Sequence, residues 1–208
     1  MTRHLRATAA ALVACVLSGA ACAAGGPLGI DHRLALDESG IWARRNQRAV
    51  YDLSALTVLG GALWEGSDSR LGKTFWKSAE SMALADIAAT GLKAVTRRAR
   101  PSQGNDPNDW WGSASNRSFP SNEVAHISAI VTPFIAEYAP DHPAVWGLAA
   151  LPMYVGIARM KSQAHWQTDV LAGAALGAGI GYYEYSRQSA WSATVLPHGL
   201  TIGFRRRF

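Results

Sequence analysis

The residues best suited to chemistry are Arg159, His165 and Asp169, which follow one another over eleven positions. His165 and Asp169 are four residues apart, so on a helix they would share one face. A carboxylate beside one ring nitrogen of a histidine fixes the tautomer and leaves the other nitrogen free as a nucleophile. Arg159 precedes the histidine by six residues and could reach the same pocket across a short polar link. The alternative is a capped helix start with a satisfied histidine and a surface ion pair.

A basic cluster ends a long helical pattern, with Lys93, Arg97, Arg98 and Arg100 just before Pro101. Lys93 and Arg100 are seven residues apart, about two helical turns, so they are expected to point the same way and bind an anion. The alternative is a solvated basic helix end, which suits the negative end of the helix dipole. We assign Arg97 and Arg98 to that role or to contact with anionic lipid.

A third cluster opens an apolar helical pattern with the residues Pro120, Ser121, Asn122, Glu123 and His126. Ser121 is a preferred N-cap residue. A helix N-terminus offers free backbone N–H groups and the positive end of the dipole, which together bind anions. Without a ligand, the same residues would simply cap the helix. Glu123 and His126 lie one turn apart.

Together the three clusters resemble the type 2 phosphatidic acid phosphatase (PAP2) superfamily, which includes bacterial class A acid phosphatases and vanadium haloperoxidases. That family carries Lys-x6-Arg-Pro, then Pro-Ser-Gly-His, then Ser-Arg-x5-His-x3-Asp. The chain has the motifs in the same order over residues 93–169, with identical spacing in the first and third. The resemblance implies a helical phosphatase whose chemistry needs no metal and no other cofactor.

The resemblance also implies a role for each matching residue. His165 would attack phosphorus in line and form a phosphohistidine, while Asp169 would orient it and stabilise its charge. Other residues would hold the phosphoryl oxygens by charge or hydrogen bonds; they are Lys93, Arg100, Arg159, Ser121 and the backbone of Asn122.

Two positions depart from the family pattern. Ala158 replaces a serine, which removes at most a supporting hydrogen bond. Glu123 replaces the histidine that protonates the leaving alcohol. Glu123 could be the acid itself if desolvation raised its pKa, although neighbouring cations would lower it. His126, oriented by Glu123, could donate instead, and we favour it. A third alternative is that neither donates, which leaves an impaired phosphatase or one specialised for good leaving groups.

The elements that must position these clusters are helices. Apolar periodicity predicts helices over about 48–64, 74–98, 122–138, 143–160 and 166–187. Turn residues predict a loop over 101–119, whose length indicates a function. Trp110 and Trp111 in this loop would form a lid over the substrate or an edge that faces the membrane. Alternatively, they would pack over the end of the bundle. We therefore expect an all-α bundle of five or six helices over residues 25–187, with an extended segment or hairpin at 188–208.

Residues 1–24 predict a secretory signal peptide, with a basic start, an apolar run and small residues near the end. The alternatives are an uncleaved membrane anchor and a lipoprotein attached through Cys15. Both Cys15 and Cys22 fall in this segment, so the mature chain would have no thiol. We expect an exported, periplasmic protein, either free or membrane-associated.

The composition is 49% hydrophobic and 17% charged, which excludes a disordered chain. Removing Arg3 and Arg6 with the leader lowers the formal charge from +5 to +3, which suits an anionic ligand or a membrane surface. The sequence has no basic stripe interleaved with aromatic residues, which is the pattern that would indicate nucleic-acid binding. The apolar runs are shorter than a comfortable membrane span. The sequence therefore does not decide whether the protein is soluble or embedded in a membrane.

The sequence therefore predicts a metal-independent phosphatase that hydrolyses a phosphomonoester or a pyrophosphate, soluble or lipid-linked, through a phosphohistidine. Its expected partners are the phosphorylated substrate and a membrane surface, not nucleic acid. Two rival functions remain: a vanadate-dependent haloperoxidase, against which the short chain argues, and a catalytically degenerate protein that binds anions or lipids.

Overall fold

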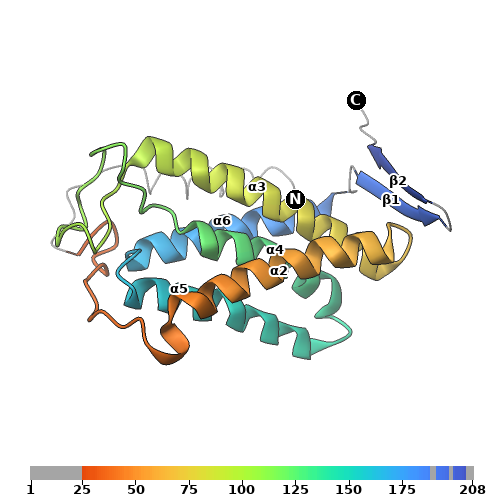
Figure 1. Ribbon diagram of the computed structural model, residues 1–208, viewed down its shortest axis with the longest axis horizontal. Helices are drawn as coiled ribbons and strands as arrows, with labels where there is room; N and C mark the ends of the chain where they lie inside the picture. The colour runs from red at the N-terminus through yellow and green to blue at the C-terminus, as the bar shows by residue number, and fades with distance from the viewer. Residues whose placement is uncertain (1–24, 188–190, 197–198, 205–208) are drawn as a thin grey trace.

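A computed structural model describes residues 25–187, 191–196 and 199–204 of the chain, and the predicted signal segment 1–24 lies outside them. Within these residues, five α-helices form an elongated bundle, and a two-stranded hairpin lies at one end (Figure 1). The elements are η1 (Gly40–Trp42), α2 (Arg44–Glu65), α3 (Arg70–Thr96), α4 (Asn122–Tyr138), η2 (Pro143–Ala149), α5 (Ala150–Lys161), α6 (Gln167–Ser186), β1 (Trp191–Leu196) and β2 (Gly199–Phe204). The expected all-α bundle is confirmed.

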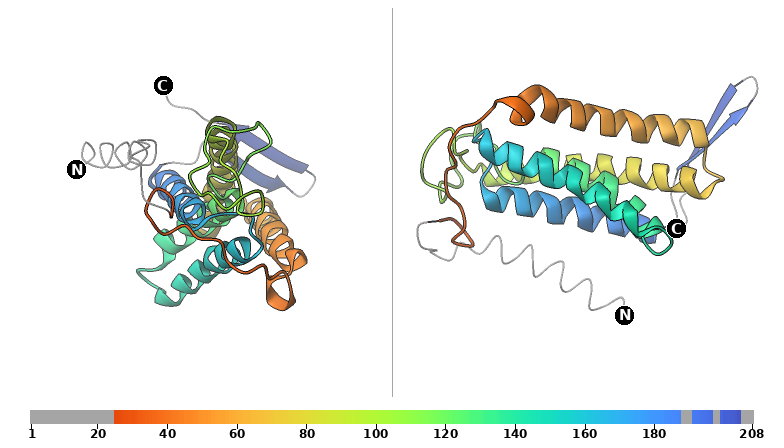
Figure 2. Two further views of the ribbon diagram at one scale, coloured as in Figure 1. Left: turned by 90° about the vertical axis from the view of Figure 1, so that its left-hand side faces the viewer. Right: turned by 90° about the horizontal axis from the view of Figure 1, so that it is seen from below.

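Helix α4 is the centre of the bundle and packs against the four other helices (Figure 2). It is apolar on nearly every face, which is the pattern of a helix that is buried all round. Its side chains Val124, Ile127 and Val131 form one core with Val58 of α2 and Val155 of α5. Asn122 and Glu123, the two polar residues at the start of α4, are therefore held on a rigid helix.

Helix α6 approaches α4 closely because glycines face it. A Cβ atom at Gly173 would collide with the carbonyl oxygen of Ser121, and one at Gly177 would collide with that of Ala125. The Ser121 N–H donates to the carbonyl oxygen of Asp169 at 2.9 Å. The start of α4 and the start of α6 are thereby fixed side by side.

Several element boundaries differ from the sequence prediction. Helix α3 begins at Arg70, where the Ser69 side chain accepts a hydrogen bond from Gly72 N–H, and it ends at Thr96 rather than at 98. The helix predicted over 143–160 is a 3₁₀-helix followed by α5. The C-terminal segment forms an antiparallel hairpin, which was one of the two forms expected, with Trp191 opposite Phe204.

The outer side of α2 carries large apolar side chains in contact with solvent. Leu53, Leu56, Leu63 and Trp64 are 61%, 65%, 42% and 86% exposed. At 100° per residue these positions fall on one side of the helix. None of the helices in the described residues is both long and apolar enough to span a membrane.

Candidate active site

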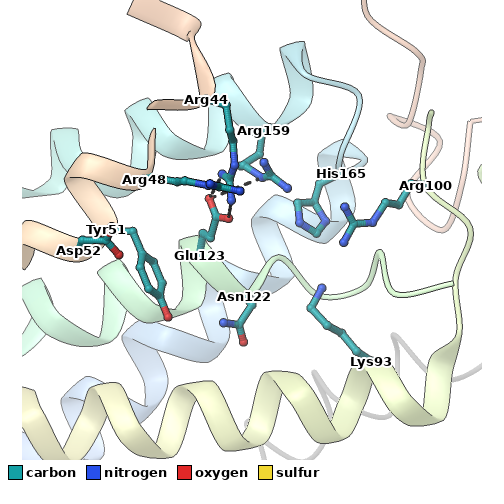
Figure 3. A pocket seen from close by; sticks show the side chains of 10 residues that line it. All are labelled: Arg44, Arg48, Tyr51, Asp52, Lys93, Arg100, Asn122, Glu123, Arg159 and His165. Atoms are coloured by element: carbon teal, nitrogen blue, oxygen red, sulfur yellow. Dashed lines mark hydrogen bonds and ion pairs between the residues drawn. The ribbon is translucent and has the colours of Figure 1, made fainter. Parts of the chain in front are cut away.

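A cavity of about 320 Å³ lies where the polar ends of the helices meet (Figure 3). Its lining comes from α2, α3 and the loop after it, the start of α4, the end of α5 and the turn before α6. The lining residues are Arg44, Arg48, Tyr51, Asp52, Lys93, Arg100, Asn122, Glu123, Arg159 and His165. Five are cationic side chains and two are carboxylates, so the cavity is suited to an anion.

His165 is the histidine of this cavity, and it is held as a neutral ring. Burial lowers its pKa to about 3, and the charges of Lys93 and Arg159 act in the same direction. Its Nδ1 lies 3.7 Å from Oδ2 of Asp169, which is close enough for attraction but too far for a hydrogen bond. Nε2 is therefore the nitrogen that a ligand in the cavity can meet.

The spacing predicted that His165 and Asp169 share one helix face, and this prediction is wrong. Helix α6 begins at Gln167, and His165 lies in the turn before it. The pair meets because Asp169, in the first turn, reaches back and accepts a hydrogen bond from Trp166 N–H at 2.9 Å. The indole of Trp166 in turn donates to the carbonyl oxygen of Ala99. The pair is thus set by a helix N-terminus rather than by helical periodicity.

Asp169 is fully buried and strongly hydrogen bonded. Its Oδ1 accepts from Arg98 at 2.6 Å, and its Oδ2 accepts from Ser118 Oγ at 2.5 Å. Burial alone would raise the pKa of Asp169, but the neighbouring His165, Arg98 and Ser118 outweigh burial, and the net pKa is lowered. Asp169 is therefore a fixed anion beside His165.

Arg98 has a different role from the solvated helix end that the sequence suggested. It is fully buried, pairs with Asp169 and with Asp31 at 2.6 Å each, and lies over the ring of Trp110 at 4.5 Å. The prediction for Arg98 was wrong because Arg97 adopts a left-handed backbone conformation, φ 45°, which turns the next side chain inwards. Arg97 itself is exposed, as expected.

Lys93 and Arg100 both line the cavity, but not for the reason predicted. Because α3 ends at Thr96, Arg100 lies in the loop and not two turns along the same helix. The Lys93 ammonium donates to the carbonyl oxygens of Arg117 at 2.8 Å and Ser118 at 3.2 Å. Burial, together with the charge of Arg100, lowers the pKa of Lys93 to about 7.

Glu123 lies in the cavity as one half of an ion pair. Arg44 donates from Nη1 to Oε2 at 2.8 Å and from Nη2 to Oε1 at 2.5 Å, while Arg159 Nε lies 3.6 Å from Oε2 (Figure 3). Burial raises the pKa of Glu123, but the hydrogen bonds from Arg44 and the charge of Arg159 outweigh it, and the net pKa is lowered. This direction opposes the role of a proton donor.

His126 lies apart from the cavity lining. It is 2% exposed, its Nδ1 is 2.9 Å from Oδ2 of Asp86, and its ring stacks on Tyr51 with centroids 3.9 Å apart. The predicted Glu123–His126 pair is wrong, since each residue has another partner. Three helical residues turn by 300°, so Glu123 faces Arg44 while His126 faces α3.

Ser121 and Asn122, at the start of α4, differ in their relation to the cavity. Ser121 is the N-cap residue, as predicted, but its side chain makes no capping hydrogen bond and does not line the cavity. Asn122 does line the cavity, and its amide donates to Asp86 Oδ1 at 3.1 Å. A direct substrate contact from Ser121 stays a prediction.

A family model described as the PAP2 superfamily matches residues 74–192, which is more than half of the chain. The chain belongs to the PAP2 superfamily. It is 31% identical over 143 residues to the lipid A 1-phosphatase of Porphyromonas gingivalis, a match that covers 67% of this chain and 29% of that protein. The chain therefore spans under a third of the length of this relative.

Two solved structures are similar to this PAP2 chain. One is the transmembrane PAP2-type phosphatidylglycerolphosphate phosphatase from Bacillus subtilis, with 17% identity, a TM-score of 0.50, and coverage of 88% of this chain and 85% of that one. The other is Aquifex aeolicus LpxE, with 20% identity, a TM-score of 0.46, and coverage of 68% and 84%. The first likeness supports the helical fold.

The PAP2 motif residues are joined in the cavity by side chains that the sequence analysis missed. Helix α2 contributes Arg44, Arg48, Tyr51 and Asp52, and α3 contributes Asp86 to the neighbouring contacts. The sequence did carry a sign of this charged face. Residues 44, 48 and 52 are spaced four apart, so on a helix they share one face. Among the described residues, no group of three or more His, Cys, Asp or Glu side chains is placed to hold a metal ion.

Proposed function

We propose that this PAP2 protein is a phosphatase that cleaves a phosphomonoester or a pyrophosphate through a phosphohistidine on His165, without a metal. The observation that carries the proposal is a buried, neutral histidine in a cavity that it shares with Lys93, Arg100 and Arg159. A neutral ring keeps its lone pair, and the three cations attract the phosphoryl oxygens.

In the proposed reaction, Nε2 of His165 attacks phosphorus while the bond to the leaving oxygen breaks. The ring becomes a cation, which the fixed charge of Asp169 stabilises at Nδ1. The three cations offset the negative charge that spreads over the phosphoryl oxygens, and each donor of this kind contributes about 10²–10³ in rate. Water then attacks the phosphohistidine, releases inorganic phosphate and returns the neutral ring.

We further propose that the substrate is a lipid phosphate at a membrane surface. The relative named lipid A 1-phosphatase supports a lipid substrate. The exposed Leu53, Leu56, Leu63 and Trp64 lie on the helix whose first turns line the cavity. An apolar face that begins beside an anion site, at Leu53, would place a headgroup in the cavity while the acyl chains stay in the bilayer. Export to the periplasm remains a prediction from the leader sequence.

The test is phosphate release from a panel of lipid and soluble phosphates, with and without a chelator. We expect release that the chelator does not change, and a labelled phosphoenzyme that is stable in alkali and labile in acid, as a phosphohistidine is. His165→Asn should abolish both signals. A protein that binds phosphate but releases none from any substrate would instead be the degenerate binding protein.

A further inference from the structure

The segment that precedes α2 crosses the end of the bundle at which α6 begins (Figure 2). In this segment Asp31 has a fully buried carboxylate, which belongs to none of the three sequence motifs. Its Oδ1 accepts a hydrogen bond from Thr168 N–H at 2.8 Å, and its Oδ2 accepts from Thr168 Oγ1 and from Arg98 Nη2 at 2.6 Å each. Asp31 therefore contacts both the residue before Asp169 and the arginine that pairs with it.

Asp31, Thr168 and Arg98 form a closed triangle of hydrogen bonds behind Asp169. Arg98 Nη1 donates to Thr168 Oγ1 at 2.8 Å and to Asp169 Oδ1 at 2.6 Å, and the Thr168 hydroxyl donates in turn to Asp31. The side chains of Asp31, Arg98 and Asp169 are all 0% exposed. A fully satisfied buried network of this kind is rigid, because water is absent and cannot replace a partner that moves away.

The charge of Asp31 also bears on His165. The charges of Asp169 and Arg98 alone would cancel, whereas two carboxylates around one guanidinium leave one net negative charge. Oδ2 of Asp169 lies 3.7 Å from Nδ1 of His165. Because the site is buried, this charge acts on the ring more strongly than it would in water. It would therefore stabilise the ring cation that forms in the proposed reaction.

The same segment, residues 31–34, also holds the start of the turn that carries His165. Arg33 donates from Nε and Nη2 to Oε1 of Gln163 at 3.0 and 2.8 Å, and the Gln163 amide donates to the Leu34 carbonyl oxygen at 2.8 Å. Gln163 has a left-handed backbone, φ 54°, which is unfavourable for a residue with a Cβ atom. With Asp31 beyond the other end of the turn, the segment contacts residues on both sides of His165.

We propose that Asp31 is a positioning residue of this phosphatase, which holds Arg98 and Thr168 so that Asp169 presents a fixed negative charge to His165. The inference rests on the proposed phosphohistidine mechanism. It extends the active site to a segment that lies before the family match, which begins at residue 74. Asp31 does not line the active-site cavity, so it acts through Asp169 and contacts no substrate.

The test is Asp31→Asn, which keeps the shape of the side chain and removes its charge. With p-nitrophenyl phosphate we expect kcat to fall by about tenfold or more, and the formation of labelled phosphoenzyme in a single turnover to slow by the same factor. The dissociation constant of inorganic phosphate, measured by calorimetry, should change by less than about twofold, since the cations that line the cavity are unaltered. A slower chemical step with unchanged phosphate binding is the signature of a positioning role.

The matched control is Asp37→Asn, which removes an aspartate charge a few residues further along the chain. Asp37 pairs with Lys161 at 3.3 Å, where the two side chains are 32% and 33% exposed, and it lies outside the cavity lining. Ion pairs this exposed contribute little, so kcat should stay within about twofold of the wild type.

The outcomes separate this inference from the proposed function. If the wild type releases phosphate and Asp31→Asn keeps its kcat within about twofold, the positioning role is wrong and the phosphatase stands. Equal losses of kcat and phosphate affinity in Asp31→Asn would also overturn it, because they would show that Asp31 supports the cavity as a whole. No phosphate release by the wild type from any substrate would overturn the proposed function, and this inference with it.

A second variant covers the case in which Asp31→Asn does not fold, as judged by its melting curve. Thr168→Val removes the hydroxyl that joins Asp31 to Arg98 and leaves every charge in place. We expect kcat to fall by about threefold or more with phosphate binding unchanged. An unchanged kcat in this variant would overturn the proposal.

Discussion

Two histidine–aspartate pairs lie within this bundle, and the tighter one is not the pair in the cavity. His126 Nδ1 is 2.9 Å from Asp86, whereas His165 Nδ1 is 3.7 Å from Asp169. Both rings are nearly fully buried, at 2% and 4% exposed. Residue type, burial and hydrogen-bond length therefore do not distinguish a reactive histidine from a structural one.

The surroundings distinguish them. His165 shares its cavity with Lys93, Arg100 and Arg159, and its partner Asp169 is held rigidly from behind by Arg98. His126 lies against the ring of Tyr51, outside the cavity lining. A reactive histidine needs space for a ligand and charges that attract the ligand. Of these two pairs, the His165–Asp169 pair has both.

The largest effect is expected at His165. His165→Asn removes the nucleophile and should lower kcat/KM by about 10³-fold or more, measured by phosphate release. The fold should survive, because asparagine is smaller and polar. Retention of more than a tenth of the wild-type rate would show that His165 is not the attacking group.

Asp169→Asn should have the next largest effect. It removes the charge that stabilises the ring cation, and a loss of about 10²-fold or more in kcat is expected. It also leaves Asp31 as the one carboxylate in the described part of the chain that pairs with Arg98, which should cost about 3 kcal/mol of unfolding free energy in urea titrations. The matched Asp86→Asn variant should change kcat by less than about threefold. Equal losses in the two variants would erase the distinction between the pairs.

The cations around His165 also predict a pH dependence. With a pKa of about 7, Lys93 is charged below that pH, as its proposed contact with phosphate requires, and it loses this charge as pH rises through it. We expect kcat/KM to fall above about pH 7, by up to tenfold per unit. Lys93→Arg should remove this alkaline decline, because arginine stays charged. His165, with a pKa of about 3, should cause no loss of activity between pH 5 and 7.

The smallest effect is expected at His126. His126→Gln should lower kcat/KM by less than about threefold for aryl and alkyl phosphates alike, and it should mainly reduce stability by about 1–2 kcal/mol. A loss confined to alkyl phosphates would instead identify His126 as the proton donor that the sequence favoured. Parallel assays on both substrate types make this comparison.

The sequence predicted well those features that local rules govern. Proline, glycine and polar runs marked most helix ends, and apolar periodicity marked the helices. The spacing of Lys93, Arg100, Arg159 and His165 identified the family, and all four line one cavity. The helical spacing used to explain their meeting was wrong, because Arg100 lies in the loop after α3 and His165 lies in the turn before α6.

Tertiary structure decided which side chains meet across elements. Arg44 and Glu123 are 79 residues apart in the chain, and their bidentate pair exists because α2 packs beside the start of α4. Likewise, Arg98 became a buried support for Asp169 because one left-handed residue turned it inwards. Local sequence encodes helices and motif order, since these depend on neighbours along the chain. Which cation neutralises which carboxylate depends on long-range packing, and that pairing decides which charges remain available in the cavity.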